Sequence, residues 1–335
     1  MAYIHAKRVG NKTYYTLRIS AKQNGKVITK DLCNLGDDLA KIDIGDLEKQ
    51  YKDKIRKSYR VLKKFLESNI YLEKAKRIKI RQSIYLSKEQ LWEIEAIRLH
   101  YASKFLKLDN LTQKEIMEMF MINFAVNSTA IEGNTITLKE ASNLFREDII
   151  PKNRTLREVY DLTNTKKAWD FLVQGMPKLD LGTIQAVHDM LLENIDKRKG
   201  YRMHDIRIYG QPFKPSPARY VIPDIKLLLE WYNSNKKMHP FMLAAFFHHK
   251  FERVHPFSDG NGRTGRMLMN YILFQSKYPP LVVSRKFRED YLDALNEADK
   301  ALKKGLTAFD EKNYKELIEF MVLQYKLSYW DIFLF

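Results

Sequence analysis

One short segment, residues 255–266, holds a dense set of reactive side chains. It reads HPFSDGNGRTGR and combines a histidine, a carboxylate, three glycines, an asparagine and two arginines. His255 is the candidate general base, because an imidazole titrates near neutral pH. The glycines leave backbone N–H groups open to an anion, and each arginine offers a planar fork that suits phosphate oxygens. The segment therefore predicts a site that holds a polyphosphate beside a base.

The sequence around the glycines predicts a loop that leads into a helix. From Arg263 onward, apolar residues recur at helical spacing. Free N–H groups and the positive end of the helix dipole make such a helix start an anion site, and neighbouring N–H groups can form a nest. We expect Arg263 and Arg266 on one side of the first turn, because they are three residues apart. The nest itself would consist of Gly260, Asn261 and Gly262.

Asp259 is the candidate metal ligand of this site. A carboxylate beside phosphates suits Mg²⁺, which prefers oxygen ligands and usually bridges to substrate phosphates. Two other histidines, His248 and His249, precede the segment without a second set of ligands at metal spacing. We interpret them as helix residues, one of which faces the core.

Residues 255–266 resemble the signature of Fic proteins, H-x-F-x-[D/E]-G-N-G-R-x-x-R, and match it at every specified position. The flanking stretches FMLAAFFHHKFERV and YPPLVVSRKFREDYLDALNEA are similar to the family's neighbouring helices, and the similarity runs from about Leu86 to about Gln324. The resemblance implies a Fic-type helical core and an enzyme that uses ATP and Mg²⁺. Such enzymes move AMP to a Ser, Thr or Tyr hydroxyl of a target protein and release pyrophosphate. The target can be the enzyme itself. The resemblance also implies that Arg263 and Arg266 hold the outer phosphates, and that the side chain of Asn261 helps the nest.

A second motif lies upstream, where residues 128–133 read STAIEG. This segment resembles the family's inhibitory pattern [S/T]-x-x-x-E-[G/N], carried on a helix that we expect around residues 115–133. The resemblance implies that Glu132 pairs with Arg266 and so removes the fork needed by the γ-phosphate. The sequence also allows a Glu132 that caps its helix or faces solvent. If the enzyme instead removes AMP, Glu132 would orient a water molecule. A reaction that uses another nucleotide or phosphate donor is a further alternative.

The run DIRIYGQPFKPSPARYVI predicts two short strands around a proline-rich turn. In the Fic family a hairpin here, the flap, holds the target segment by strand addition. The candidate strands are Arg219 to Ile222 and a docking strand of Ile206, Arg207, Ile208 and Tyr209. An ordinary surface hairpin is the alternative, and the turn is longer and richer in proline than the family's pattern.

Composition sets bounds on the chain as a whole. Its 335 residues can bury a substantial core, and the low glycine and proline content, 13 and 10 residues, favours a mainly α fold. One cysteine excludes an internal disulfide framework and favours a reducing compartment. We expect no signal peptide and no membrane span, and hence a soluble, cytoplasmic protein. The oligomeric state, including a homo-oligomer, is open.

The N-terminal quarter has a different character. Residues 1–81 contain 21 Lys and Arg but 9 Asp and Glu, so 21 − 9 = +12 of the total charge of +17 lies there. Short β-like stretches, with hairpin turns at residues 10–11 and 24–25, predict a small antiparallel sheet. We therefore expect a basic β domain at residues 1–36, a charged helical linker at 37–85, and a Fic domain at 86–335. Ser87 is the expected N-cap of its first helix.

The charge of this basic arm, residues 1–81, is compatible with two kinds of partner. It suits nucleic acid, which makes a nucleic-acid-binding regulator an alternative function, and it equally suits an acidic protein surface. Tyr14 and Tyr15 are neighbours on a predicted strand and must point to opposite faces. At most one of them can therefore stack on a base.

Overall fold

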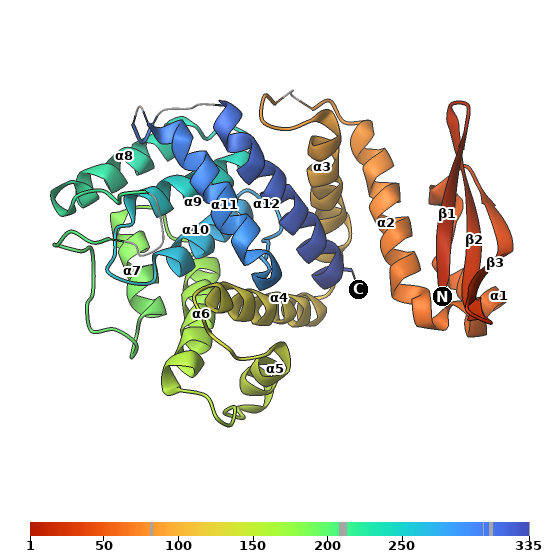
Figure 1. Cartoon of the computed structure of the whole chain (residues 1–335), viewed down its shortest axis with the longest axis horizontal. Helices are drawn as coiled ribbons and strands as arrows, with labels where there is room; N and C mark the ends of the chain where they lie inside the picture. Colours follow the sequence, from red (N-terminus) through yellow and green to blue (C-terminus); the bar gives the residue numbers. More distant parts are fainter. Residues whose placement is uncertain (81–82, 208–212, 304, 308–310, 335) are drawn as a thin grey trace.

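The computed structural model describes residues 1–80, 83–207, 213–303, 305–307 and 311–334. Its elements lie on two sides of one helix, α2 (Tyr59–Lys76), as Figure 1 shows. A small three-stranded sheet lies on one side of α2 and a larger helical body lies on the other. The fold is mainly α with a small antiparallel sheet, as the sequence predicts.

The sheet is built from consecutive antiparallel hairpins. Its strands, in spatial order, are β1 (Ala2–Val9), β2 (Lys12–Gln23) and β3 (Lys26–Gly36). Gly10, Asn24 and Gly25 have φ angles of 59°, 51° and 77°, the positive values that tight hairpin turns require. The two predicted turns and the three strands are confirmed.

The sheet buries one face against the helices that follow it. Leu17 of β2 packs with Leu47 of α1 (Ile44–Ile55) and with Leu62 of α2. Further along α2, Tyr71 belongs instead to the core of the helical body. Thus α2 connects two hydrophobic cores, and the division of the chain into domains at residues 36 and 85 stays a prediction.

The helical body surrounds two central helices that carry the site, α9 and α10. Its α-helices are α3 (Lys88–Ser103), α4 (Asn110–Ile131), α5 (Leu138–Glu147), α6 (Leu156–Gly175), α7 (Leu181–Leu191), α8 (Val221–Ser234), α9 (Pro240–Val254), α10 (Asn261–Gln275), α11 (Arg288–Asp299) and α12 (Glu311–Ile332). Short 3₁₀ turns occur at Leu39–Lys41, Arg56–Ser58, Phe105–Lys107, Ala218–Tyr220, Arg285–Phe287 and Lys300–Leu302. The predicted cap of α3 is confirmed, because Ser87 Oγ accepts the N–H of Gln90 at 3.1 Å. No helix in the described part of the chain is long and apolar enough to cross a membrane.

The second strand expected for the flap is wrong. Residues 218–220 form a 3₁₀ turn, and α8 begins at Val221. Val221, Ile225 and Leu228 are fully buried, so the spacing of the apolar residues is helical and not alternating. Pro223 does not prevent a helix here, because the N–H groups of a first turn have no intrahelical acceptor to lose.

Candidate active site

His255 lies where α9 ends. Its backbone is left-handed, with φ 51° and ψ 63°, and its N–H donates to the carbonyl of Phe251 at 3.0 Å. The helix stops there because Pro256 follows, and a residue before proline is disfavoured in the helical region. Arg202 fixes the turn: its Nε donates to the carbonyl of His255 at 2.8 Å. The proline and this arginine therefore hold His255 in one orientation.

The imidazole of His255 is arranged to accept a proton at Nε2. Its Nδ1 lies 3.2 Å from the backbone carbonyl of Glu252. A carbonyl can only accept, so Nδ1 carries the hydrogen and Nε2 keeps its lone pair. Burial lowers the pKa of His255 to about 4, so the ring is neutral at pH 7.

The loop between His255 and α10 is shaped by Asn261 and Gly260. Asn261 Oδ1 accepts the N–H of Phe257 at 2.9 Å, and its Nδ2 donates to the carbonyl of Phe257 at 2.8 Å. Gly260 has φ 75°, and a Cβ there would lie 2.5 Å from Leu192 Cδ2. Asn261 therefore stabilises the loop through both ends of its amide, and Gly260 allows the chain to turn against α7.

The start of α10 presents free N–H groups, and a carboxylate from another helix faces it. The N–H groups of Gly262 and Arg263 donate no backbone hydrogen bond within the described part of the chain. A Cβ on Gly262 would lie 2.3 Å from Glu132 Oε1 and 2.9 Å from Arg266 Nη1. The carboxylate of Glu132 thus lies directly against the helix end that the sequence assigned to phosphate.

Glu132 reaches this place from the end of α4, where it is the C-cap residue. Its Oε1 accepts from Arg266 Nη2 at 2.8 Å, while Ser128 of the same motif accepts from Arg266 Nε through its hydroxyl at 3.0 Å. Burial opposes the charge of Arg266, but Tyr291 and Glu132 outweigh it and raise the pKa of the guanidinium. The carboxylate of Glu132 is therefore directed at the motif, although 44% of its side chain is exposed.

The two motif arginines have different surroundings. Arg263 is 4% exposed and pairs with the carboxylate of Asp161 on α6. It also lies 3.4 Å from Asp259 Oδ1. Arg263 therefore supports the loop through buried contacts, whereas Arg266 faces the pocket at His255. The expected grouping of both arginines around outer phosphates stays a prediction.

Asp259 is accessible enough to bind a cation. Its side chain is 35% exposed, and its Oδ2 accepts from Arg157 Nη2 at 2.9 Å. Arg157 is itself 60% exposed. No group of three metal-binding side chains occurs among the described residues. Mg²⁺ does not need one, because it commonly uses one or two carboxylates together with substrate phosphates.

Glu252 is a site residue that sequence reasoning missed. Its Oε2 lies 4.0 Å from His255 Nδ1, and its buried Oε1 has no hydrogen-bond partner in the described part of the chain. Burial raises the pKa of Glu252 to about 8. A carboxyl group three residues before the histidine was visible in the sequence, but its burial was not. Arg202 and Asp161 were also missed, because they approach from distant parts of the chain.

The histidines before the motif are structural. His248 and His249 are 0% and 1% exposed, so both face the core. The sequence predicts only one of them there, and that prediction is wrong. His249 Nε2 lies 3.0 Å from Asp299 Oδ1, and its Nδ1 lies 3.1 Å from the hydroxyl of Tyr314. These contacts join α9 to α11 and α12.

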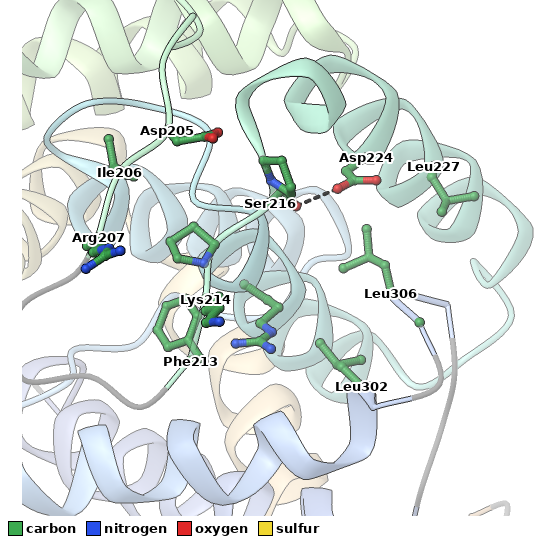
Figure 2. A pocket seen from close by; sticks show the side chains of 14 residues that line it. Asp205, Ile206, Arg207, Phe213, Lys214, Ser216, Asp224, Leu227, Leu302 and Leu306 are labelled. Atoms are coloured by element: carbon green, nitrogen blue, oxygen red, sulfur yellow. Dashed lines mark hydrogen bonds between the residues drawn. The ribbon is translucent and has the colours of Figure 1, made fainter.

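A second, larger cavity of about 1410 Å³ adjoins the pocket at His255. Figure 2 shows its wall, where residues 205–207 and 213–217 face α8 and Leu302. Phe213 and Arg253 line both cavities, and the guanidinium of Arg253 lies 4.8 Å from the centre of the Phe213 ring. Of the expected docking strand, Ile206 and Arg207 line this cavity without forming a strand. Ile208 and Tyr209 lie outside the described residues.

Comparisons with known proteins identify the fold. Residues 178–273 match the model of the Fic/DOC family, a range that includes the motif at His255 but not Glu132. Protein adenylyltransferase fic-1 of Caenorhabditis elegans is 29% identical over 183 residues, which cover 52% of this chain and 36% of that protein. Protein adenylyltransferase Fic of Culex quinquefasciatus is 30% identical over 192 residues, which cover 53% and 37%. The chain thus spans less than two fifths of the length of these relatives.

Solved structures of Fic proteins have the same fold. A Fic-domain-containing signaling protein from Bacteroides thetaiotaomicron has a TM-score of 0.63 at 22% identity, covering 70% of this chain and 94% of that chain. A Fic family protein from Desulfovibrio desulfuricans has a TM-score of 0.59 at 26% identity, covering 74% and 75%. The motif, the family model and the shared fold together place a Fic/DOC domain at residues 178–273, within a helical body that has the fold of the solved Fic structures.

Proposed function

We propose that this protein is an adenylyltransferase that moves AMP from ATP to a hydroxyl of a target protein and is restrained by its own Glu132. The observation that carries the proposal is a neutral imidazole beside a helix N-terminus whose arginine is already paired with a carboxylate. The names of the two relatives described above support the same activity.

The residues of the chain have distinct tasks in this reaction. Nε2 of His255 takes the proton of the target hydroxyl, whose oxygen then attacks the α-phosphorus while pyrophosphate departs in line. The N–H groups at the start of α10 stabilise charge on the phosphate oxygens, and Arg266 binds the γ-phosphate once it is free of Glu132. Positioning and electrostatics supply most of the acceleration in phosphoryl chemistry.

The carboxylate of Asp259 would hold Mg²⁺ together with the substrate phosphates. It has the exposure and the displaceable partner, Arg157, that such a role needs. When bound, the ion neutralises phosphate charge.

The cavity shown in Figure 2 is the proposed entrance for the target segment. It shares Phe213 and Arg253 with the pocket at His255, and its volume is about 1410 Å³. Ile206 and Arg207 on its wall are placed to contact that segment, which keeps the proposed docking role for this part of the chain.

Restraint by Glu132 follows from the space it occupies. The pocket at His255 measures about 210 Å³ with Glu132 in its wall. Small-molecule sites usually measure roughly 300–1,000 Å³. A nucleotide therefore needs Glu132 to move, both to make room and to release Arg266.

The test uses ATP labelled at either the α- or the γ-phosphate. We expect Glu132→Gly to gain label from α-labelled ATP only, with a mass increase of one AMP unit on the enzyme or on added protein. His255→Ala in the same background is the matched control and should gain no label. Label from the γ-position, or label that survives His255→Ala, would show a different reaction.

A further inference from the structure

The outward face of the N-terminal sheet is rich in hydrogen-bond donors along its central strand, β2. Two inward side chains fix the alternation along β2: Leu17 is fully buried, and the ring of Tyr15 lies 6.2 Å from that of Phe65, edge to face. Side chains alternate along a strand, so the even-numbered residues of β2 point away from α1 and α2. In order along β2 these are Lys12, Tyr14, Thr16, Arg18, Ser20 and Lys22.

Each member of this row can donate a hydrogen bond, and the row contains neither a carboxylate nor an aliphatic side chain. On β1, Lys7 lies opposite Tyr14 and His5 lies opposite Thr16, so both belong to this face. Exposed Val9 and Val27 lie opposite Lys12 and Lys22, at the two ends of the face. Tyr14 is 39% exposed, so its ring is available for contact. A row of cationic and hydroxyl donors that contains no carboxylate suits a polyanion.

The nearby carboxylates do not neutralise this face. Lys12 pairs with Asp37 at 3.0 Å, and Arg18 pairs with Asp31 at 2.7 Å. On this face, Lys7 and Lys22 have no carboxylate partner in the described part of the chain.

We propose that this outward face of the sheet binds double-stranded DNA, with β2 lying in the major groove. The ten-residue span from Lys12 to Lys22 measures about 34 Å, which is comparable to one turn of the duplex. The major groove, about 12 Å wide, admits a two-stranded β-ribbon, and β1 and β2 form such a pair with Lys7 opposite Tyr14.

Two competing partners fit this face less well. The deep, narrow major groove of A-form RNA excludes such an element. A protein partner would need a central cluster of apolar or aromatic anchors. The exposed valines of this face, Val9 and Val27, instead lie at its opposite ends, each beside a lysine. The sheet projects from the helical body beyond α2, which leaves room for a duplex (Figure 1).

The test measures binding of the full chain to a fluorescent duplex of about 20 base pairs by anisotropy, between 50 and 200 mM salt. In the variant Lys7→Ala/Arg18→Ala/Lys22→Ala, we expect at least tenfold weaker binding. The slope of log affinity against log salt should fall by about 2.7, because each phosphate contact contributes about 0.9. Lys139→Ala/Lys152→Ala/Lys197→Ala removes equal charge from exposed sites of the helical body and should bind like the wild type.

The double variant Lys7→Ala/Lys22→Ala keeps the pair of Arg18 with Asp31 and guards against misfolding of the triple variant. It should still weaken binding. His255→Ala should bind like the wild type, because the sheet acts independently of the motif. The proposal fails if the duplex does not bind at 50 mM salt, if the sheet and control variants bind alike, or if duplex RNA or polyglutamate binds as tightly as DNA.

Discussion

Replacing Glu132 by glycine should activate the enzyme, and the structure sets the size of the effect. Arg266 is 2% exposed and Glu132 is 44% exposed, with 2.8 Å between Nη2 and Oε1. A hydrogen bond to a charged group contributes about 1.5–3 kcal/mol, and the exposure of Glu132 places this one near 2 kcal/mol. Because about 1.4 kcal/mol corresponds to a factor of ten, release of Arg266 should raise the rate of AMP transfer about 30-fold.

Glu132→Gln separates charge from volume. The amide keeps most of the bulk against Gly262 but loses the negative charge, so its rate should lie between those of the wild type and Glu132→Gly. The assay is the initial rate of pyrophosphate release, which needs no knowledge of the target if the enzyme modifies itself. Calorimetry with a non-hydrolysable ATP analogue gives a second readout, in which Glu132→Gly should bind more tightly. A rate and an affinity within threefold of the wild type would refute the reasoning.

Three further outcomes follow from the site. His255→Ala should lower AMP transfer by at least a thousandfold in the Glu132→Gly background while leaving affinity for the ATP analogue unchanged, as single-turnover labelling and calorimetry would show. For Glu252, burial raises the folded pKa from an ordinary 4.5 to about 8, so the folded state holds a proton that the unfolded state releases, and stability is lost as pH rises between those values. The difference in unfolding free energy between Glu252→Gln and the wild type should therefore shift in favour of Gln from pH 5 to pH 8, and a difference independent of pH would contradict this. Arg263→Ala leaves the carboxylate of Asp161 buried without its partner and should cost about 3–5 kcal/mol in urea unfolding, whereas a loss below 1 kcal/mol would mean that Arg263 serves the substrate more than the fold.

Local signals in the sequence were enough for several parts of the fold. The hairpin turns of the sheet follow from glycine and asparagine, which tolerate positive φ at low cost. The cap at Ser87 follows from a side chain that can satisfy a free N–H of the first turn. The predicted flap strand at residues 219–222 is wrong because its local signal is too short to decide between strand and helix. Four residues rich in β-branched and aromatic side chains are ambiguous, and the longer helical spacing through Leu228 decides the element.

The candidate site divides in the same way. Residues 255–266 contain a base, a nest and two arginines within one turn and one loop, so their chemistry could be read from spacing alone. Spacing could not show that Arg263 and Arg266 face different partners, because Asp161 and Glu132 arrive on α6 and α4. Nor could it show that Glu252 is buried, since burial depends on every element packed around α9.

The sequence by itself determined the reactive groups of this protein, the helix start that gathers them and the basic character of its first quarter. These properties depend on residue type and on neighbours a few positions away. The resemblance implies the pair of Arg266 and Glu132, but only the tertiary structure brings their charges together, and it alone reveals the pair of Arg263 and Asp161. Arg266 and Glu132 are separated by 134 residues, yet their side chains share one hydrogen bond at the end of α10. Pairing over such a separation depends on how α4 packs beside α10, and this packing is set by the shared hydrophobic core and not by any local pattern.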